Sequence, residues 1–257
     1  WKLVYLKDLI VNAELPVDMN SFKSQQHRWV KGGVQTAFKI LPRILNRPEL
    51  SLNVKKEAVF HLLGNISYLL LLILLFSMFP LGYFWDYYGF NQFVLMNLAA
   101  ISAGTLSFFF FYVYTVREAC GKNWLSYLKY VPLAIATGIG LSINNAKAVL
   151  EAFSGKSSEF VRTPKFALTD RRDIRKFAGY RSLREFTSYM EIAAGLIFFV
   201  QTVYAVYMGY FSWIPFLLLI QAGFLYTGFM SIGHGYGSGK SGSIPGTVLS
   251  RPFFPRE

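Results

Sequence analysis

The chain has 257 residues and a formal net charge of +12; 53% of its residues are hydrophobic and 16% are charged. Soluble domains carry about 25% charged residues. Three runs without Asp, Glu, Lys or Arg exceed the roughly 20 apolar residues that cross a bilayer, namely 58–85, 87–116 and 192–239. This composition excludes an ordinary soluble enzyme and predicts a mainly α-helical, polytopic membrane protein. The single cysteine excludes an intrachain disulfide.

The N-terminal residues 2–14 are typical of one or two short strands. Pro16 ends this pattern, and Asn20 or Ser21 can then cap a helix over about 22–46. Its apolar positions are Phe22, Trp29, Val30, Val34, Phe38, Leu41 and Leu45. The other side carries Lys23, Lys31, Lys39 and Arg43. A basic amphipathic helix of this kind is typical of the membrane interface.

Four membrane spans are predicted, in two hairpins. The first pair covers 60–83 and 93–116, and the second covers 188–210 and 213–233; neither connection contains Lys or Arg. The basic residues lie between and beside the hairpins, so the positive-inside rule places these flanks and both chain ends in the cytoplasm. Cytoplasmic loops also explain the positive charge better than nucleic-acid binding does.

Residues 131–152 are apolar but contain Asn144 and Asn145. We interpret them as an interfacial or re-entrant helix, because a fifth crossing would move the basic segment 154–186 to the wrong side of the membrane. Glu191 stands at the cytoplasmic end of the third span. We expect it among the lipid headgroups, and the alternative is a buried, functional carboxylate.

Seven segments follow from these patterns. They are a short N-terminal strand segment (1–19), an amphipathic interfacial helix (20–56), a transmembrane hairpin (57–117), a loop with an interfacial helix (118–153), a basic cytoplasmic loop (154–186), a second transmembrane hairpin (187–233) and a cytoplasmic tail (234–257).

Gln25, Arg28 and Trp29 stand at i, i+3 and i+4, so a helix places them on one face. Arginine offers a planar fork that suits phosphate oxygens, glutamine both donates and accepts hydrogen bonds, and the indole is a flat apolar surface for a sugar ring. This set would suit a ligand with a phosphate at one end and a ring at the other. The alternative is an interfacial tryptophan beside a snorkelling arginine.

The string Gln25-Gln26-His27-Arg28-Trp29 resembles the Q-x-x-R-W signature of processive family 2 glycosyltransferases, which include cellulose, hyaluronan and chitin synthases. The wider string ELPVDMNSFKSQQHRW looks most like the mannan- and glucan-synthase-like branch. The segment SEFVRTPKF (158–166) is similar to the F-x-V-T gating loop of cellulose synthases, although Arg162 replaces the valine. The order of motif helix, span pair, interfacial helix, basic loop and span pair also resembles that family.

The resemblance implies roles for individual residues. Arg28 would face the nucleotide diphosphate, Gln25 the donor or acceptor hydroxyls, and Trp29 the acceptor sugar at a channel mouth. Phe160, Thr163 and Lys165 would close over the nucleotide. The implied partners are a nucleotide-sugar donor, a polysaccharide acceptor and the lipid bilayer, in a bacterial inner or plasma membrane with the site facing the cytoplasm.

The family's metal-binding aspartates and its general base have no counterpart here, since Asp8, Asp18 and Glu14 do not form D-x-D or E-D. The resemblance therefore implies that this chain is the C-terminal membrane portion of a longer enzyme, with residues 1–19 as the C-terminal edge of its glycosyltransferase catalytic domain and 154–186 as a gating-like loop. The general base and the ligands of a divalent Mg or Mn would lie in an upstream catalytic domain, and this portion would be inactive alone.

Two other functions stay open. A non-processive relative would add one sugar to a lipid, because the Q-x-x-R-W motif also occurs in ceramide glucosyltransferase-like enzymes. A small transporter or channel module would have no glycosyltransferase domain upstream.

Overall fold

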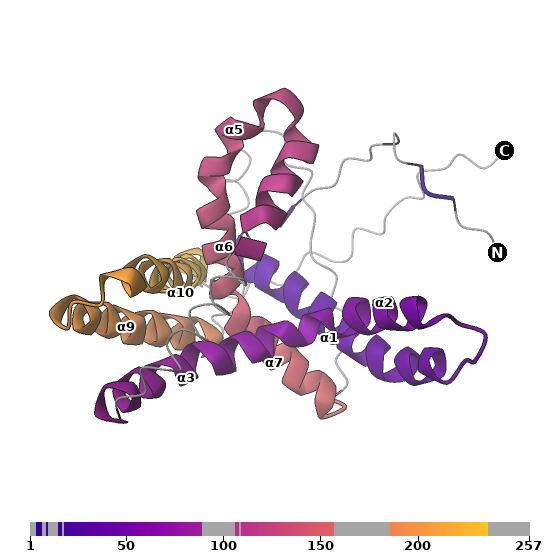
Figure 1. Cartoon of the computed structure of the whole chain (residues 1–257), viewed down its shortest axis with the longest axis horizontal. Coiled ribbons are helices and arrows are strands. Elements are labelled where there is room, and N and C mark those ends of the chain that lie inside the picture. Colours follow the sequence, from indigo (N-terminus) through magenta and orange to yellow (C-terminus); the bar gives the residue numbers. More distant parts are fainter. Residues whose placement is uncertain are drawn as a thin grey trace, which may run out of the picture.

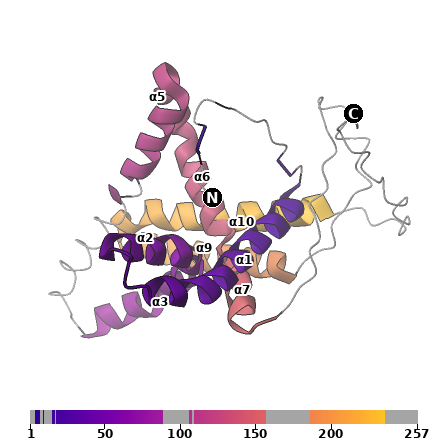
Figure 2. The same cartoon turned by 90° about the vertical axis from the view of Figure 1, so that its right-hand side faces the viewer.

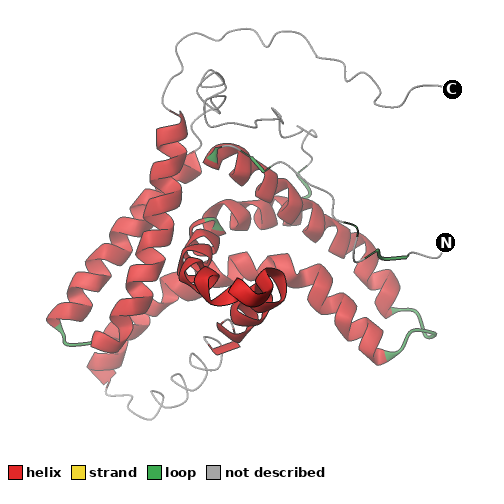
Figure 3. Cartoon of the chain, turned by 90° about the horizontal axis from the view of Figure 1, so that it is seen from above, coloured by secondary structure: helices red, strands yellow, loops and turns green. Residues whose placement is uncertain are grey.

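The computed structural model describes residues 4–6, 9, 15, 16, 18–88, 106, 107, 109–156 and 186–235. Every element in this part of the chain is a helix, joined by loops, and no strand is present in it (Figure 3). The labelled helices are α1 (Met19–Leu45), α2 (Leu52–Leu63), η1 (Gly64–Ile66), α3 (Ser67–Tyr88), η2 (Gly121–Asn123), α5 (Trp124–Tyr127), η3 (Leu128–Tyr130), α6 (Val131–Gly140), α7 (Ser142–Phe153), α9 (Phe186–Tyr207), η4 (Phe211–Trp213) and α10 (Ile214–Gly235). Residues 109–120 are helical as well.

The mainly helical membrane fold is therefore confirmed, whereas the short N-terminal strands are not seen. Val4–Leu6, Leu9 and Leu15 lie outside any regular element, and the other residues predicted to form strands are not among those described. A single strand has no partner for its backbone N–H and C=O groups unless another strand lies beside it, and the described residues provide none.

Helix α1 confirms the amphipathic helix predicted over 22–46, with a different cap. The side chain of Asp18, rather than of Asn20 or Ser21, accepts from the Ser21 backbone N–H at 2.9 Å. The same carboxylate accepts from the Ser21 hydroxyl at 2.6 Å. An aspartate cap satisfies a free N–H and places negative charge at the positive end of the helix dipole, so the helix begins three residues earlier than predicted.

Three helices are long and apolar enough to cross a membrane among the described residues: Leu52–Ser77, Phe186–Tyr207 and Ile214–Gly233. The last two confirm the predicted second hairpin, and α9 and α10 lie side by side in Figures 1 and 2. The first span begins before residue 60, because α2, η1 and α3 follow one another without a loop. Most of the predicted span 93–116 lies outside the described residues, but its end from residue 109 is helical. The bent pair of Phe109–Gly140 and Ser142–Phe153 makes a fourth span if the two helices form one crossing.

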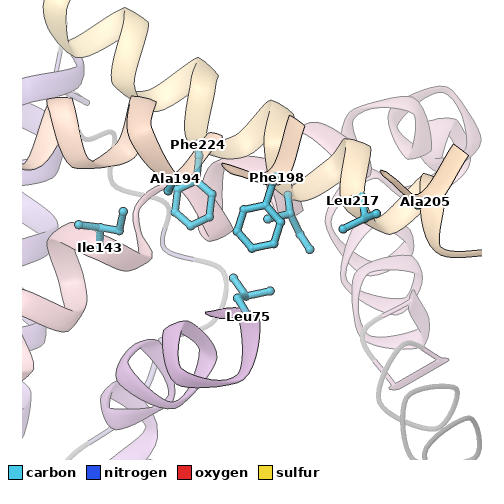
Figure 4. Close-up of a cluster of buried hydrophobic side chains, with 8 residues drawn as sticks. Leu75, Ile143, Ala194, Phe198, Ala205, Leu217 and Phe224 are labelled. Atoms are coloured by element: carbon cyan, nitrogen blue, oxygen red, sulfur yellow. The ribbon is translucent and has the colours of Figure 1, made fainter. Parts of the chain in front are cut away.

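The second hairpin packs around a hydrophobic core to which α3 and α7 also contribute side chains. Figure 4 shows this core, with Phe198 of α9 beside Phe224 of α10. Their rings are stacked with centroids 5.9 Å apart, and both side chains are almost completely buried. Leu75 of α3 and Ile143 of α7 complete the contact. The core therefore joins elements from both halves of the chain.

Helix α6 crosses α10 at very short range. A Cβ added at Gly223 would overlap the Ala136 carbonyl, and one added at Gly140 would overlap the Gly223 carbonyl and Thr227. Glycine is needed at both positions because only a missing side chain lets the two backbones approach this closely.

The apolar segment 131–152 forms a broken helix, as α6 and α7 meet at Leu141 with a bend of 41°. Asn144 and Asn145 are buried just after the bend. Beyond them, α7 packs Ala148 and Val149 against Val30 and Val34 of α1. The helix predicted to be re-entrant or interfacial is thus a bent pair whose second half supports α1.

Candidate functional site

Gln25, Arg28 and Trp29 lie together on one side of α1, as their spacing predicts. At about 100° of rotation per residue, they face away from Val30, Val34 and Ala37, which are buried against the rest of the protein. The Trp29 side chain is 62% exposed, and Gln25 and Arg28 are partly exposed. We call this side of α1 the outer face; its role in substrate binding stays a prediction.

Arg28 has a local partner within α1. Its Nη1 donates to the Ser24 hydroxyl, one turn earlier, at 3.1 Å. This bond holds the guanidinium against the preceding turn of α1. Trp29 has its exposed indole on the same face, so the outer face presents a cation, an amide and a flat ring within five residues of α1.

The opposite side of α1 carries a buried ion pair that the sequence did not predict. Lys23 Nζ lies 2.8 Å from Glu191 Oε1 and 3.0 Å from Oε2, and the two side chains are 1% and 0% exposed. Lys23 also donates to the hydroxyls of Ser188 at 3.2 Å and Ser231 at 3.4 Å. Lys23 belongs to the basic side predicted for this helix, and the structure buries it. The expectation that Glu191 lies among the headgroups was wrong, because its side chain is buried, as in the alternative.

A local sequence pattern could not reveal the burial of Lys23 and Glu191, because each charge has its partner in a distant part of the chain. Lys23 and Glu191 are 168 residues apart. A lysine in a basic amphipathic helix normally extends into water, and burying it alone would be prohibitive, so only the partner makes burial tolerable. Glu191 at a span end was the available signal, since an ionisable residue in a span commonly has a partner.

A second ion pair joins α1 to α7. Lys31 Nζ lies 3.1 Å from Glu151 Oε2, and His27 Nε2 lies 3.5 Å from the same oxygen. Burial raises the pKa of Glu151, but the Lys31 hydrogen bond and the charges of His27 and Lys147 lower it more, so the net pKa is below its ordinary value. The Lys31 side chain is 4% exposed, so a second lysine of the predicted basic side is buried.

Three asparagines surround the first pair. Asn144 Nδ2 donates to the Lys23 carbonyl at 2.9 Å, and Asn20 Nδ2 donates to the Ser231 carbonyl at 2.9 Å. Asn144 also donates to the Asn145 side chain at 3.1 Å. These bonds connect the first turns of α1 to α7 and to α10, so the start of the motif helix is held from two directions.

The other predicted site residues cannot be placed. Phe160, Thr163 and Lys165 lie outside the described residues, as do Asp8 and Glu14. Within the described ranges, no three His, Cys, Asp or Glu side chains form a group that could hold a metal ion. The described residues therefore offer no group of ligands for Mg or Mn.

Comparison with known proteins gives partial similarity to plant enzymes. A probable glucomannan 4-β-mannosyltransferase 9 from Oryza sativa subsp. japonica is 38% identical over 61 residues, which is 24% of this chain and 12% of the relative. Glucomannan 4-β-mannosyltransferase 1 from the same species is 34% identical over 61 residues, again 24% of this chain and 12% of the relative. Glucomannan 4-β-mannosyltransferase 7 from Arabidopsis thaliana is 38% identical over 52 residues, or 20% of this chain and 9% of the relative.

The chain thus matches about a tenth of the length of these curated relatives. No family model matches the chain, and no solved structure matches it. The relatives named are plant proteins, so a bacterial origin stays a prediction. The partial similarity supports a family-level link between this membrane-spanning chain and the glycosyltransferases named in these relatives.

Proposed function

We propose that the chain is the C-terminal membrane portion of an inverting, processive family 2 glycosyltransferase. It would extend a β-linked glucan or mannan with sugar from a nucleotide-sugar donor and help to translocate the product. The observation that carries this proposal is the outer face of α1, where Gln25, Arg28 and Trp29 gather on a helix that is held against the membrane spans. The partial similarity to glucomannan mannosyltransferases supports the same reaction class.

In this proposal, an acceptor hydroxyl attacks the anomeric carbon of the donor from the side opposite the leaving group. The bond from that carbon to the diphosphate breaks, and its electron pair leaves with the nucleoside diphosphate. Arg28 stabilises the negative charge that grows on the diphosphate, which a fixed guanidinium does more effectively than mobile water. The hydroxyl proton passes to a general base in the upstream catalytic domain, which also supplies the divalent metal site.

The other two residues position the substrates. Gln25 hydrogen-bonds sugar hydroxyls through an amide that can donate and accept. Trp29 offers its exposed ring to the acceptor sugar, since a flat apolar surface matches the C–H face of a sugar ring. We place this site on the cytoplasmic side of the membrane, where the basic residues between the hairpins lie by the positive-inside rule.

The experiment measures incorporation of labelled glucose or mannose by membranes that contain the full-length protein. Arg28→Ala and Trp29→Ala should each reduce incorporation by at least about a hundredfold, the scale for removing a group that stabilises a transition state. Lys39→Ala is the matched control, because Lys39 is an exposed cation on the same helix. Full activity in both site variants, at normal membrane expression, would overturn the assignment.

Product size then tests processivity. A processive enzyme yields long polymer from the first minutes of reaction, whereas an enzyme that adds one sugar to a lipid yields a single glycolipid. A single glycolipid product would replace processive synthesis with the non-processive alternative while leaving the role of Arg28 intact.

A further inference from the structure

Helix α1 carries two buried lysines, and each is paired with a glutamate from a different helix. Lys23 contacts Glu191 of α9, and Lys31 contacts Glu151 of α7. The two lysines are eight residues apart on one continuous helix, a separation of about 12 Å along its axis. Helix α1 is therefore held at two points by charge pairs. Lys23 lies on the side of the helix away from Arg28, and Lys31 follows Arg28 by three residues.

Apolar packing alone does not determine how such a helix is rotated. Val30 and Val34 contact Ala148, Val149 and Ala152 of α7 through small or β-branched side chains, and a surface of this kind tolerates small shifts. A buried ion pair is different, because it contributes little net stability but makes every alternative register costly. Rotating α1 by one residue, about 100°, would leave Lys23 and Glu191 buried without partners.

The surroundings of Lys23 are specific to an ammonium group. Both oxygens of Glu191 and the hydroxyls of Ser188 and Ser231 lie within 3.4 Å of Nζ. The Ser231 hydroxyl donates its own proton to the Thr227 carbonyl at 2.7 Å, which leaves its lone pairs for the lysine. Acceptors from α9 and α10 thus surround one cation from α1.

We propose that Lys23 and Lys31, with Glu191 and Glu151, are positioning residues that set the rotation of α1 and so aim Arg28 and Trp29 at the substrates. This inference rests on the proposed function for its catalytic consequence, whereas its structural part does not depend on any activity. Loss of the Lys23–Glu191 pair lets α1 turn about its axis, and Arg28 then leaves the donor diphosphate even though the helix itself persists.

The structural test measures a distance between two spin labels in the full-length protein, in nanodiscs, with native cysteines replaced. One label is at Thr36→Cys, an exposed position two turns beyond Trp29 on the outer face, and the other is at Val203→Cys, 54% exposed on α9. Lys23→Met should shift or broaden the distance distribution by several ångströms. The charge exchange Lys23→Glu with Glu191→Lys should restore it, and Lys39→Met should leave it unchanged.

The catalytic test uses the same variants. In Lys23→Met, the KM for the nucleotide sugar should rise at least fivefold, and the charge exchange should return it to within about twofold of the parent. Phe198→Ala is the control for a general folding defect, because it weakens the core of α9 and α10 without touching α1; it should lower the amount of active enzyme and leave KM unchanged.

The outcomes separate the two proposals. If the parent protein incorporates no sugar from any nucleotide donor, the proposed function fails, and the label distances still decide whether the pairs orient α1. If Lys23→Met keeps both the parent distance distribution and the parent KM, the positioning role is overturned. If Lys23→Met does not accumulate in membranes, the label distance and the KM are measured instead on Lys31→Met, whose partner Glu151 is partly exposed.

Discussion

The first membrane span and the second hairpin are all apolar enough to cross a bilayer but are packed very differently. In the most apolar stretch of Leu52–Ser77, 6% of the residues are buried by the rest of the protein, compared with 39% in Phe186–Tyr207 and 33% in Ile214–Gly233. The first span has the higher mean hydropathy, 2.2 against 1.5 and 1.6. Hydropathy therefore reports how well a helix suits lipid, whereas packing depends on small and polar residues at chosen positions.

The residues of the hairpin show how this packing is made. Gly195 of α9 meets Leu225 of α10, and Gly228 of α10 meets Ile192 of α9, so a side chain fills the space beside each glycine. In the first span, Leu70, Ile73 and Leu74 are more than half exposed. The contrast predicts that equal substitutions will have unequal effects in the two regions.

The largest effect is expected at Phe198. Phe198→Ala should lower the free energy of unfolding by about 3 kcal/mol, because it leaves a cavity beside Phe224 in the shared core. Phe199 is the matched control, since it is the next residue and 50% exposed; Phe199→Ala should cost less than about 1 kcal/mol. Denaturation with SDS in mixed micelles measures both, and equal losses would contradict the packing described for α9.

A somewhat smaller effect is expected at the crossing of α6 and α10. Gly223→Leu should destabilise the protein by about 2 kcal/mol, because the new side chain overlaps the Ala136 backbone and the helices must separate. Gly138→Leu on α6 is the control, as a Cβ there meets nothing within 4 Å. Thermal unfolding in detergent gives the comparison, and a tolerated Gly223→Leu would rule out the close crossing.

Within the first span, two adjacent leucines differ in burial, and their substitutions should differ in effect. Leu75 is 5% exposed against the hairpin core, whereas Leu74 is 57% exposed. Leu75→Ala should cost about 1.5 kcal/mol, below the usual range for a core leucine because lipid can partly replace the lost contacts. Leu74→Ala should be within about 0.5 kcal/mol of the parent. If the two variants unfold alike, the first span does not dock on the hairpin as described.

The smallest effect is expected in the pH dependence of the stability that Glu151 contributes. Its pKa is lowered in the folded protein, so its pairing stabilises the fold above the ordinary pKa of a glutamate, about 4.3, and this contribution is lost as pH falls through the lowered value. The melting temperature of Glu151→Gln should therefore approach that of the parent as the pH is lowered from 6 to 3. A constant difference across this range would contradict the pairing with Lys31 and His27.

Sequence reasoning succeeded where a local pattern was enough. The amphipathic period predicted α1, and the uncharged runs predicted the hairpin of α9 and α10. Spacing by three and four residues placed Gln25, Arg28 and Trp29 on one face, because that depends only on helix geometry. The same reasoning placed Asn144 in an apolar segment that proved to be bent, since buried amides are uncommon in a straight lipid-facing helix.

Local patterns did not reveal which faces are covered. Trp29 and Phe38 of the predicted apolar side are exposed, whereas Lys23 and Lys31 of the predicted basic side are buried. The cap was also misassigned, because Asp18, Asn20 and Ser21 are all good caps and only Asp18 has its side chain on the Ser21 amide. Asn20 instead bonds α10.

The sequence by itself determined that this protein is a set of apolar and amphipathic helices, and that Gln25, Arg28 and Trp29 share one face of α1. Only the tertiary structure decided which charges leave water, because Lys23 and Lys31 become tolerable inside the protein only when Glu191 and Glu151 arrive from helices far along the chain. The physical reason is that periodicity separates polar from apolar surface, whereas lipid and protein interior are equally apolar, so the partner of each surface appears only when the helices are assembled.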